Sequence, residues 1–327
     1  MSDTAQARND LSIKKNNVIF RRMDFKDSVY NESTVYGLIR SLMIPYLRSA
    51  TCDTIYKIFN NFFFFQYVSA FLPGRVPVTK VDHPLDEKIP FKPSWVTIYI
   101  DFTQFWIRMI AFFLRRYGKR AYTHVRDLTI SMGKLYLFAS EIYRKNLSTT
   151  KRPFYIGRPR FFMIHVTDPH LMCIPSLHVM IVIHAYTVFI DIINKLGDEE
   201  KYKEQVIELK QGALAICQAI FFVKQHSINC MPAALYAMTC YNEELFPVKA
   251  AEDFISLLFS PAPKNDLLPK NCRIHPAVSP ATKINKDDQE KIKSHIRSLY
   301  NRFIEEGKTS ASWKDPVLNF LRTYSKQ

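Results

Sequence analysis

The sequence predicts an all-α fold, a helical bundle, and two observations support it. Alternating apolar and polar residues, which mark half-buried strands, are scarce, whereas apolar residues spaced three and four apart recur along the chain. The 327 residues include only 8 Gly against 25 Phe and 17 Tyr. With 47% hydrophobic and 23% charged residues, the composition is that of a globular protein, long enough for one large domain or for a core with extensions.

The N-terminal half of the chain alternates predicted helices with one irregular stretch. A polar lead of about 30 residues comes first, and helical patterns follow over residues 34–72. The stretch 72–94 is rich in proline, which breaks regular structure repeatedly, and is predicted to be a long surface connection. Helical patterns resume over 95–117 and 125–143.

The C-terminal half begins with a basic loop and continues as helices. After this loop, helices are predicted over 175–196 and 203–223, and another starts near Met231, where Pro232 suits a first helical turn. A loop with five prolines precedes a charged helix over 287–306 and a short C-terminal helix. We therefore predict three parts: a polar lead with helices (1–90), a helical core (91–260), and a proline-rich linker with a helical extension (261–327).

Positive charge is concentrated in two parts of the chain. The net charge is +15, and Lys and Arg cluster in residues 115–126 and 143–160. Such surfaces attract phosphates, acidic lipid headgroups or nucleic acid, and a solvated basic face is the alternative interpretation. Nucleic-acid binding would rest on charge alone, so no specific nucleic-acid partner is expected.

The compartment is predicted from the N-terminus, the cysteines and the apolar runs. The first 30 residues show no signal peptide, and six cysteines without paired spacing indicate a reduced, intracellular protein without a zinc pattern. Only one stretch free of acidic and basic residues, 169–190, has the length of a membrane span. We expect helices that are buried or in contact with a membrane, with a membrane-embedded bundle left open as an alternative.

Three short motifs carry the functional prediction. Lys151 is followed by six residues and then by Arg158–Pro159; "PSLH" covers Pro175 to His178; and "KQHSINC" contains His226. Each would arise by chance at roughly 1 in 10,000 positions if residue frequencies are about 5%. Their occurrence together, in this order, is much harder to attribute to chance.

These residue types suit phosphoryl transfer without a metal or another cofactor. That chemistry needs fixed positive charge around the phosphoryl oxygens, a nucleophile opposite the leaving group, and an acid that protonates this group. A helix start favours an anion, and imidazole titrates near neutral pH. The candidates are Lys151 and Arg158 for charge, Ser176 and the backbone N–H of Leu177 at the helix start, and His178 and His226 for proton transfer.

The ordered motifs resemble the type 2 phosphatidic-acid-phosphatase superfamily, which also includes bacterial acid phosphatases and vanadium haloperoxidases. "PSLH" and "KQH" are more similar to its branch of inositol-phosphotransferase and sphingolipid-synthase-like members, and the match covers about 151–240. The resemblance implies a helical bundle of that kind. It also implies that His226 attacks phosphorus to form a phosphohistidine and that His178 is the general acid.

The third motif departs from the family pattern at several positions. An Asp normally lies four residues after the nucleophilic histidine, one helical turn away, where it would orient the imidazole; here that residue is Cys230. The Ser-Arg pair ahead of the histidine is Ala219 and Ile220, and Lys224 could supply the missing charge or be an ordinary surface lysine. The departures imply weaker or altered transfer, or phosphate binding without turnover.

Each candidate residue also has an ordinary structural interpretation. Ser176 could cap its helix, and a histidine on an apolar helix is more often a satisfied core residue, which is our interpretation of His184. The sequence thus predicts a phosphatase or phosphotransferase acting on a phosphomonoester, pyrophosphate or lipid headgroup. A non-catalytic protein that binds phosphate or lipid headgroups at a membrane surface is the alternative, and a vanadate-dependent haloperoxidase is a third.

Overall fold

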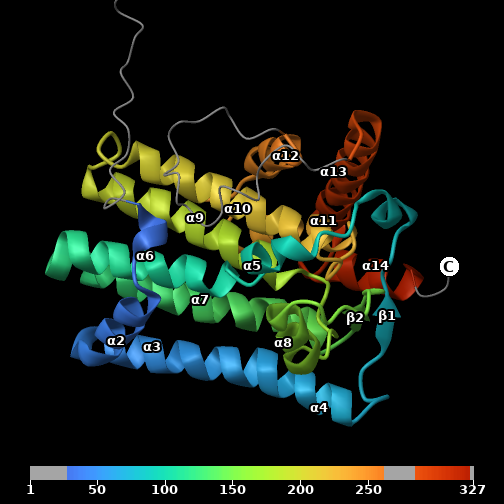
Figure 1. Ribbon diagram of the computed structural model, residues 1–327, viewed down its shortest axis with the longest axis horizontal. Coiled ribbons are helices and arrows are strands. Elements are labelled where there is room, and N and C mark those ends of the chain that lie inside the picture. Colours follow the sequence, from blue (N-terminus) through green and yellow to red (C-terminus); the bar gives the residue numbers. More distant parts are fainter. Residues whose placement is uncertain (1–27, 261–283, 325–327) are drawn as a thin grey trace, which may run out of the picture.

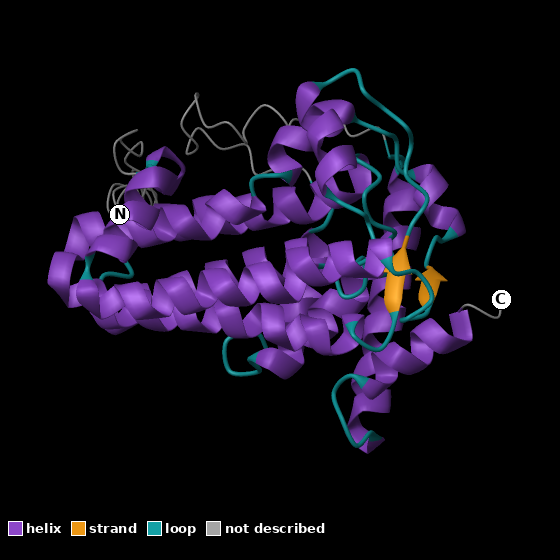
Figure 2. Cartoon of the chain, turned by 90° about the horizontal axis from the view of Figure 1, so that it is seen from below, coloured by secondary structure: helices purple, strands orange, loops and turns teal. Residues whose placement is uncertain are grey.

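The computed structural model describes residues 28–260 and 284–324. It is 73% helix and 3% strand, which confirms the predicted all-α bundle. The polar lead before residue 28 and most of the predicted proline-rich loop lie outside the described residues. Figure 1 shows the long helices side by side, with the two short strands at one end of the bundle (Figure 2).

The main helices form where the apolar spacing predicts them, with ends that differ by a few residues. The predicted ones are α2 (Thr34–Met43), α3 (Pro45–Ile58), α4 (Phe65–Phe71), α6 (Phe102–Tyr117), α7 (Tyr122–Tyr143), α9 (Leu177–Leu196), α10 (Lys203–Phe222), α11 (Cys230–Tyr241), α13 (Lys286–Thr309) and α14 (Asp315–Tyr324). A π-helical segment, Phe59–Phe64, joins α3 to α4. The helix α12 (Val248–Leu257) was not predicted.

Helix α9 lies in the middle of the bundle because it is apolar on nearly every side. It contacts α6, α7, α10 and α11, while α2 and α3 cover α6 and α7 on the outside. Helix α13 packs on α11, and α14 packs on both α13 and the first strand. One hydrophobic core includes residues from Val29 to Leu321, so all three predicted parts contribute to it.

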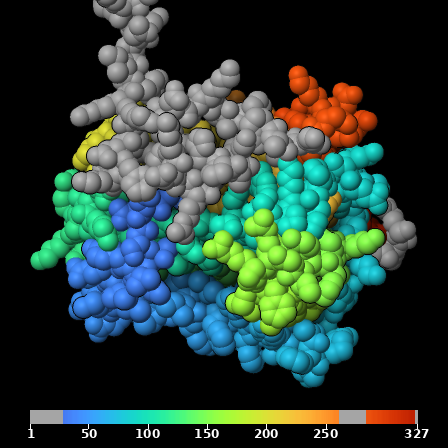
Figure 3. All heavy atoms as spheres, viewed as in Figure 1, coloured from blue at the N-terminus to red at the C-terminus, as the bar shows by residue number. Residues whose placement is uncertain are grey.

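Two stretches that were predicted to be irregular contain regular structure. Strand β1 (Val78–Lys80) lies in the proline-rich connection and pairs in parallel with β2 (Leu147–Thr149) in the basic loop. The same loop contains helix α8 (Pro159–Thr167), which lies on the face of the molecule shown in Figure 3. Strands of three residues are too short to show an alternating pattern, which explains why the sequence did not predict them.

The helix predicted over 95–117 is interrupted after α5 (Val96–Tyr99). Asp101 occupies the N-cap position of α6, and both of its carboxylate oxygens accept hydrogen bonds from Arg108, at 2.8 and 2.6 Å. Gln104 also accepts from Arg108, at 3.0 Å. The polar side chains that interrupt this apolar run therefore satisfy one another.

Two helical stretches are long and apolar enough to cross a membrane, by length and composition alone. They are residues 93–143 and Leu177–Leu196, and both are mostly buried within the bundle. This finding is compatible with membrane association.

Candidate active site

A small pocket lies where the start of α9 meets the π-helical segment, α5 and the turn before α11. Its walls are partly aromatic and partly ionisable, a combination typical of ligand sites. The residues that line it are Phe62, Gln66, Tyr99, Asp168, His170, Met172, Cys173, Leu177, His178 and His226.

The structure brings together the two histidines that the motifs single out. His178 lies in the first turn of α9, and His226 lies in the turn between α10 and α11. Their ring centroids are 5.3 Å apart, and the rings meet edge to face. Tyr99 stacks on His178 at 4.3 Å and Phe102 contacts it at 4.1 Å, so packing fixes the orientation of this imidazole.

Both imidazoles are held in the neutral form. Burial lowers the pKa of His178 to about 3. Burial, and then the positive charge that His178 and His170 carry when protonated, lower the pKa of His226 well below its usual value. A neutral imidazole can act as a nucleophile, and a bound anion would raise both pKa values by stabilising the protonated forms.

Ser176 and Leu177 are at the helix start, as predicted, but only Leu177 lines the pocket. Ser176 occupies the N-cap position of α9, yet its side chain makes no capping hydrogen bond. Its Oγ is fully buried and has no hydrogen-bond partner among the described residues. Helix capping therefore does not explain this serine.

The three predicted phosphate-binding cations are not among the residues that line the pocket. The Lys151 side chain is exposed, and its backbone N–H donates to Asp82 Oδ1 at 2.7 Å. Arg158 is exposed before the first turn of α8. Lys224 Nζ donates to the backbone oxygen of Asp86.

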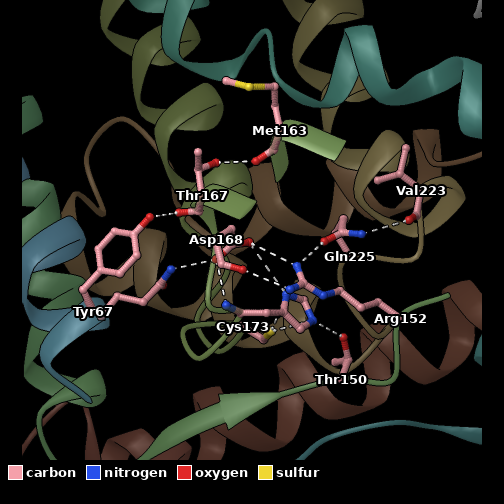
Figure 4. Close-up of polar contacts among 11 residues, drawn as sticks. Tyr67, Thr150, Arg152, Met163, Thr167, Asp168, Cys173, Val223 and Gln225 are labelled. Carbon is pink, nitrogen blue, oxygen red and sulfur yellow. Dashed lines mark hydrogen bonds and ion pairs between the residues drawn. The ribbon is translucent and has the colours of Figure 1, made fainter. Parts of the chain in front are cut away.

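Arg152 is also absent from the pocket lining, but it is hydrogen bonded to one of the lining residues, Asp168 (Figure 4). It donates to the backbone oxygen of Asp168 at 3.0 Å and to Gln225 Oε1 at 3.2 Å, so it bridges the loop before α9 and the residue next to His226. Lys151 is exposed, whereas its neighbour Arg152 is partly buried.

The sequence contains a signal that could have identified Arg152. The spacing of a lysine, six residues and Arg-Pro occurs twice in overlapping copies. One copy is Lys151 with Arg158–Pro159, and the other is Lys145 with Arg152–Pro153. Spacing alone does not show which of the two arginines faces the interior. The structure does, because Arg152 is partly buried and Arg158 is exposed.

Asp168 and His170 form a charged pair that the sequence analysis missed. Asp168 Oδ1 accepts from the His170 backbone N–H at 2.8 Å and from Gln66 Nε2 at 2.7 Å. Its Oδ2 lies 3.8 Å from His170 Nδ1 and 3.9 Å from Arg152. On the other side of the ring, His170 Nε2 lies 2.9 Å from Thr150 Oγ1.

The pKa values of His170 and Asp168 both lie far from their usual values. Burial lowers the pKa of His170, but the Cys173 sulfur and the Asp168 carboxylate outweigh burial and raise it to about 10. Burial would raise the pKa of Asp168, but His170 and then Arg152 hold it well below its usual value. His170 and Arg152 thus provide two cations beside the neutral histidines.

Within the described residues His226 is hydrogen bonded to no carboxylate; its imidazole is hydrogen bonded to the backbone of Cys173 instead. Its Nδ1 is buried and lacks a hydrogen-bond partner in residues 28–260 and 284–324. The segment 226–229 is a turn and α11 begins at Cys230, so the predicted one-turn relation between the two residues is wrong. Asp168 lines the same pocket, but it is engaged by Gln66 and His170.

Neighbouring segments hold the two histidine-bearing stretches in place. The Ser148 side chain accepts from the Ile174 N–H at 2.7 Å, which ties β2 to the residues just before α9. Asp86 Oδ1 accepts from the Ile228 N–H at 2.8 Å, and Asn229 is hydrogen bonded at 2.8 Å to His295 of α13. The strands and the C-terminal helices therefore serve to position the site.

His184, which was assigned no role, lies outside the pocket lining. Its Nε2 is hydrogen bonded to Ser131 Oγ at 2.8 Å, and burial lowers its pKa to about 4. No group of three or more His, Cys, Asp and Glu side chains in the described parts of the chain could hold a metal ion. Comparison of the chain with protein-family models, curated proteins and solved structures found no match.

Replacing Asp168 with asparagine is expected to flatten the alkaline stability profile. Because the folded-state pKa of His170 is raised to about 10, its protonation stabilises the fold fully below pH about 6.5, and this contribution is lost as the pH rises through about 10. The thermal unfolding midpoint of the wild type should therefore fall more between pH 6.5 and 10 than that of Asp168→Asn.

The matched control for this prediction is Asp191→Asn, which removes a carboxylate paired with Lys195 on the surface. The unfolding midpoint of this variant should depend on pH as that of the wild type does, since ion pairs at the surface contribute little to the free energy of unfolding. Identical slopes for the wild type and Asp168→Asn would contradict the assigned pairing of Asp168 with His170.

Proposed function

We propose that the chain is a metal-independent phosphatase or phosphotransferase that acts on a phosphomonoester, pyrophosphate or phosphate-bearing lipid headgroup. The observation that carries this proposal is the approach of the His178 and His226 ring centroids to 5.3 Å in a pocket whose lining residue Asp168 is hydrogen bonded to Arg152. Two neutral imidazoles next to fixed positive charge are the groups that covalent phosphoryl transfer requires.

The proposed reaction has two steps. His226 attacks phosphorus while the bond to the leaving oxygen breaks, and His178, protonated when the anion binds, gives its proton to that oxygen. Water or an alcohol then attacks the phosphohistidine, and His178 takes the proton from this nucleophile. Arg152 and His170 offset the charge on the phosphoryl oxygens, with Arg152 able to make a forked contact.

A second candidate function is supported by the unpartnered Nδ1 of His226. The other ring nitrogen is hydrogen bonded to the backbone of Cys173, a neutral partner, so the imidazole lacks the carboxylate that stabilises positive charge in other histidine-based sites. A protein with such a site would bind phosphate or a lipid headgroup through Arg152 and His170 without turning it over.

Turnover with and without a chelator tests the proposal. We expect the purified protein to release phosphate from a phosphomonoester, pyrophosphate or a short-chain lipid phosphate at a rate that EDTA does not change. Vanadate should inhibit, because it adopts the geometry of the phosphoryl-transfer transition state. Loss of activity with EDTA, restored by a divalent metal, would contradict the proposed mechanism.

Two other outcomes would identify the alternatives. Thermal stabilisation by phosphate or vanadate without any phosphate release would favour the binding protein. Oxidation of halide by peroxide in the presence of vanadate would indicate the haloperoxidase.

A further inference from the structure

The exposed apolar side chains are confined to one part of the surface. Within the described residues, every large apolar side chain that is exposed, except Val78, lies either between residues 35 and 72 or between 154 and 166. Phe71 is 79% exposed and Phe154 is 85% exposed. Isolated apolar residues on a surface are ordinary, but a concentration of this kind marks an interaction site.

Helix α2, in this region, is amphipathic, but its apolar face points to the outside of the bundle. Helix α2 exposes Leu38, Ile39 and Met43, whereas the residues that it buries are Gly37 and Ser41. A helix that covers a protein core in water normally presents its apolar face inward. Here the apolar face is directed away from the bundle.

The next helical segments also bury polar residues, and these make hydrogen bonds. Thr54 of α3 donates to the Thr129 backbone oxygen at 2.8 Å. Asn61 of the π-helical segment accepts from Arg144 at 2.8 Å, and Gln66 of α4 donates to Asp168 at 2.7 Å. Inward polar contacts with an apolar exterior are suited to an apolar environment outside the bundle.

These segments lie together on the molecule. Figure 1 shows α2, α3 and α4 along one side of the bundle with α8 next to α4, and Figure 3 shows the α8 segment beside the α4 end of this row. Tyr67 of α4 donates to the Thr167 backbone oxygen of α8 at 2.7 Å, which joins the two parts. We call residues 34–75 and 154–167 the apolar face.

Positive charge accompanies the apolar face. The residues of this face, 34–75 and 154–167, contain six Lys and Arg but only one acidic residue, Asp53. Arg48, Arg75, Arg158 and Arg160 are exposed there. A combination of exposed apolar and basic residues is complementary to an anionic lipid surface, where the apolar side chains enter the boundary with the acyl chains and the cations meet the headgroups.

We propose that the apolar face docks on a bilayer that contains anionic lipid, with α2, α3, α4 and α8 lying in the interface. The charges Arg48, Asp53 and Lys57 along α3 favour this position over burial in the hydrocarbon. Phe62 and Gln66, from the same row of helices, line the pocket, so docking brings the pocket close to the lipid headgroups. Access of a lipid-borne phosphate to the pocket rests on the proposed function, whereas docking does not.

Flotation of the full chain with vesicles tests the docking. We expect binding to vesicles of phosphatidylcholine with phosphatidylglycerol, and much weaker binding to phosphatidylcholine alone or at high salt. The triple variant Phe64→Ser, Phe162→Ser, Met163→Ser should lose at least about tenfold in affinity, because all three side chains are more than half exposed and leave the acyl boundary.

Charge is tested by two matched double variants. Arg75→Gln with Arg160→Gln should weaken binding about 25-fold, since each basic residue near an anionic surface contributes about fivefold. Lys249→Gln with Lys291→Gln removes the same charge from α12 and α13 and should leave binding within about twofold. Equal effects of the two double variants would overturn the docking face.

The outcomes separate docking from catalysis and from self-association. Vesicle binding without phosphate release would support the docking face and reject the proposed function. Phosphate release without vesicle binding would support the proposed function and reject the docking face. If the triple variant instead converts an oligomer to a monomer and leaves vesicle binding unchanged, the apolar face joins copies of this chain and the membrane proposal is wrong. Circular dichroism and thermal unfolding of each variant verify that the fold is kept.

Discussion

Replacing His226 with alanine is expected to lower kcat by about 10⁴-fold or more, because the substitution removes the proposed nucleophile and no covalent intermediate can form. His226 lines the pocket, and its ring lies 5.3 Å from that of His178. Phosphate binding should survive, since Arg152 and His170 supply the positive charge. The measurement is steady-state phosphate release together with thermal stabilisation by phosphate.

Direct detection of the intermediate makes this test sharper. Rapid quenching at alkaline pH followed by mass spectrometry should find a phosphoryl group on His226 in the wild type, because phosphohistidine is lost in acid. The matched control is His184→Gln, which alters another buried histidine, hydrogen bonded to Ser131 away from the pocket. That variant should unfold at a lower temperature but keep kcat within about threefold. Unchanged turnover in His226→Ala would reject the proposed nucleophile.

Much of the fold could be predicted because apolar spacing reports burial directly. Helix α9 is the clearest case, since a run that is apolar on all sides has to lie inside the bundle. Helices α2 to α4 were also located correctly, but spacing shows only that a helix has two different faces. Which face points inward depends on what surrounds the chain, and in α2 the apolar face points outward.

The site was predicted in part, and the missing part depends on contacts between distant residues. His178 and His226 could be named because each lies in a short motif. His170 and Asp168 lie in no motif, and His170 is paired with Thr150, twenty residues earlier in the chain. Thr150 directly follows β2, and the pairing of β2 with β1 fixes its position. These strands are three residues long, which is too short to give a periodic signal in the sequence.

The segment between His226 and Cys230 is a second case in which the sequence could not predict the local geometry. A spacing of four residues indicates one face only if the segment is helical, and the segment 226–229 is a turn. Burial also raises the pKa of the Cys230 thiol, so this residue is no substitute for a carboxylate. The sequence could therefore show that an acidic residue is missing but not how the histidine would be oriented.

The overlapping Arg-Pro motifs provide the most discriminating pair of variants. Arg152→Ala is expected to lower kcat/KM by about 10² to 10³-fold, because a guanidinium beside the pocket would contact the phosphoryl oxygens with two parallel hydrogen bonds. Arg158→Ala should change kcat/KM by less than about twofold, since Arg158 is exposed at the N-cap of α8, whereas Arg152 is partly buried against Asp168. Both substitutions remove one positive charge from the same loop, so long-range electrostatics affect the two variants alike.

Two further measurements distinguish phosphate contact from a structural role of Arg152. Its hydrogen bonds to the Asp168 backbone and to Gln225 also hold the loop, so Arg152→Ala should lower the unfolding temperature. Added guanidinium should restore part of the turnover of Arg152→Ala and none of that of His226→Ala, because it can replace a missing cation but not a nucleophile. If Arg158→Ala were the damaging substitution, the phosphate would bind near the exposed cations of the loop, and the pocket described above would not be the active site.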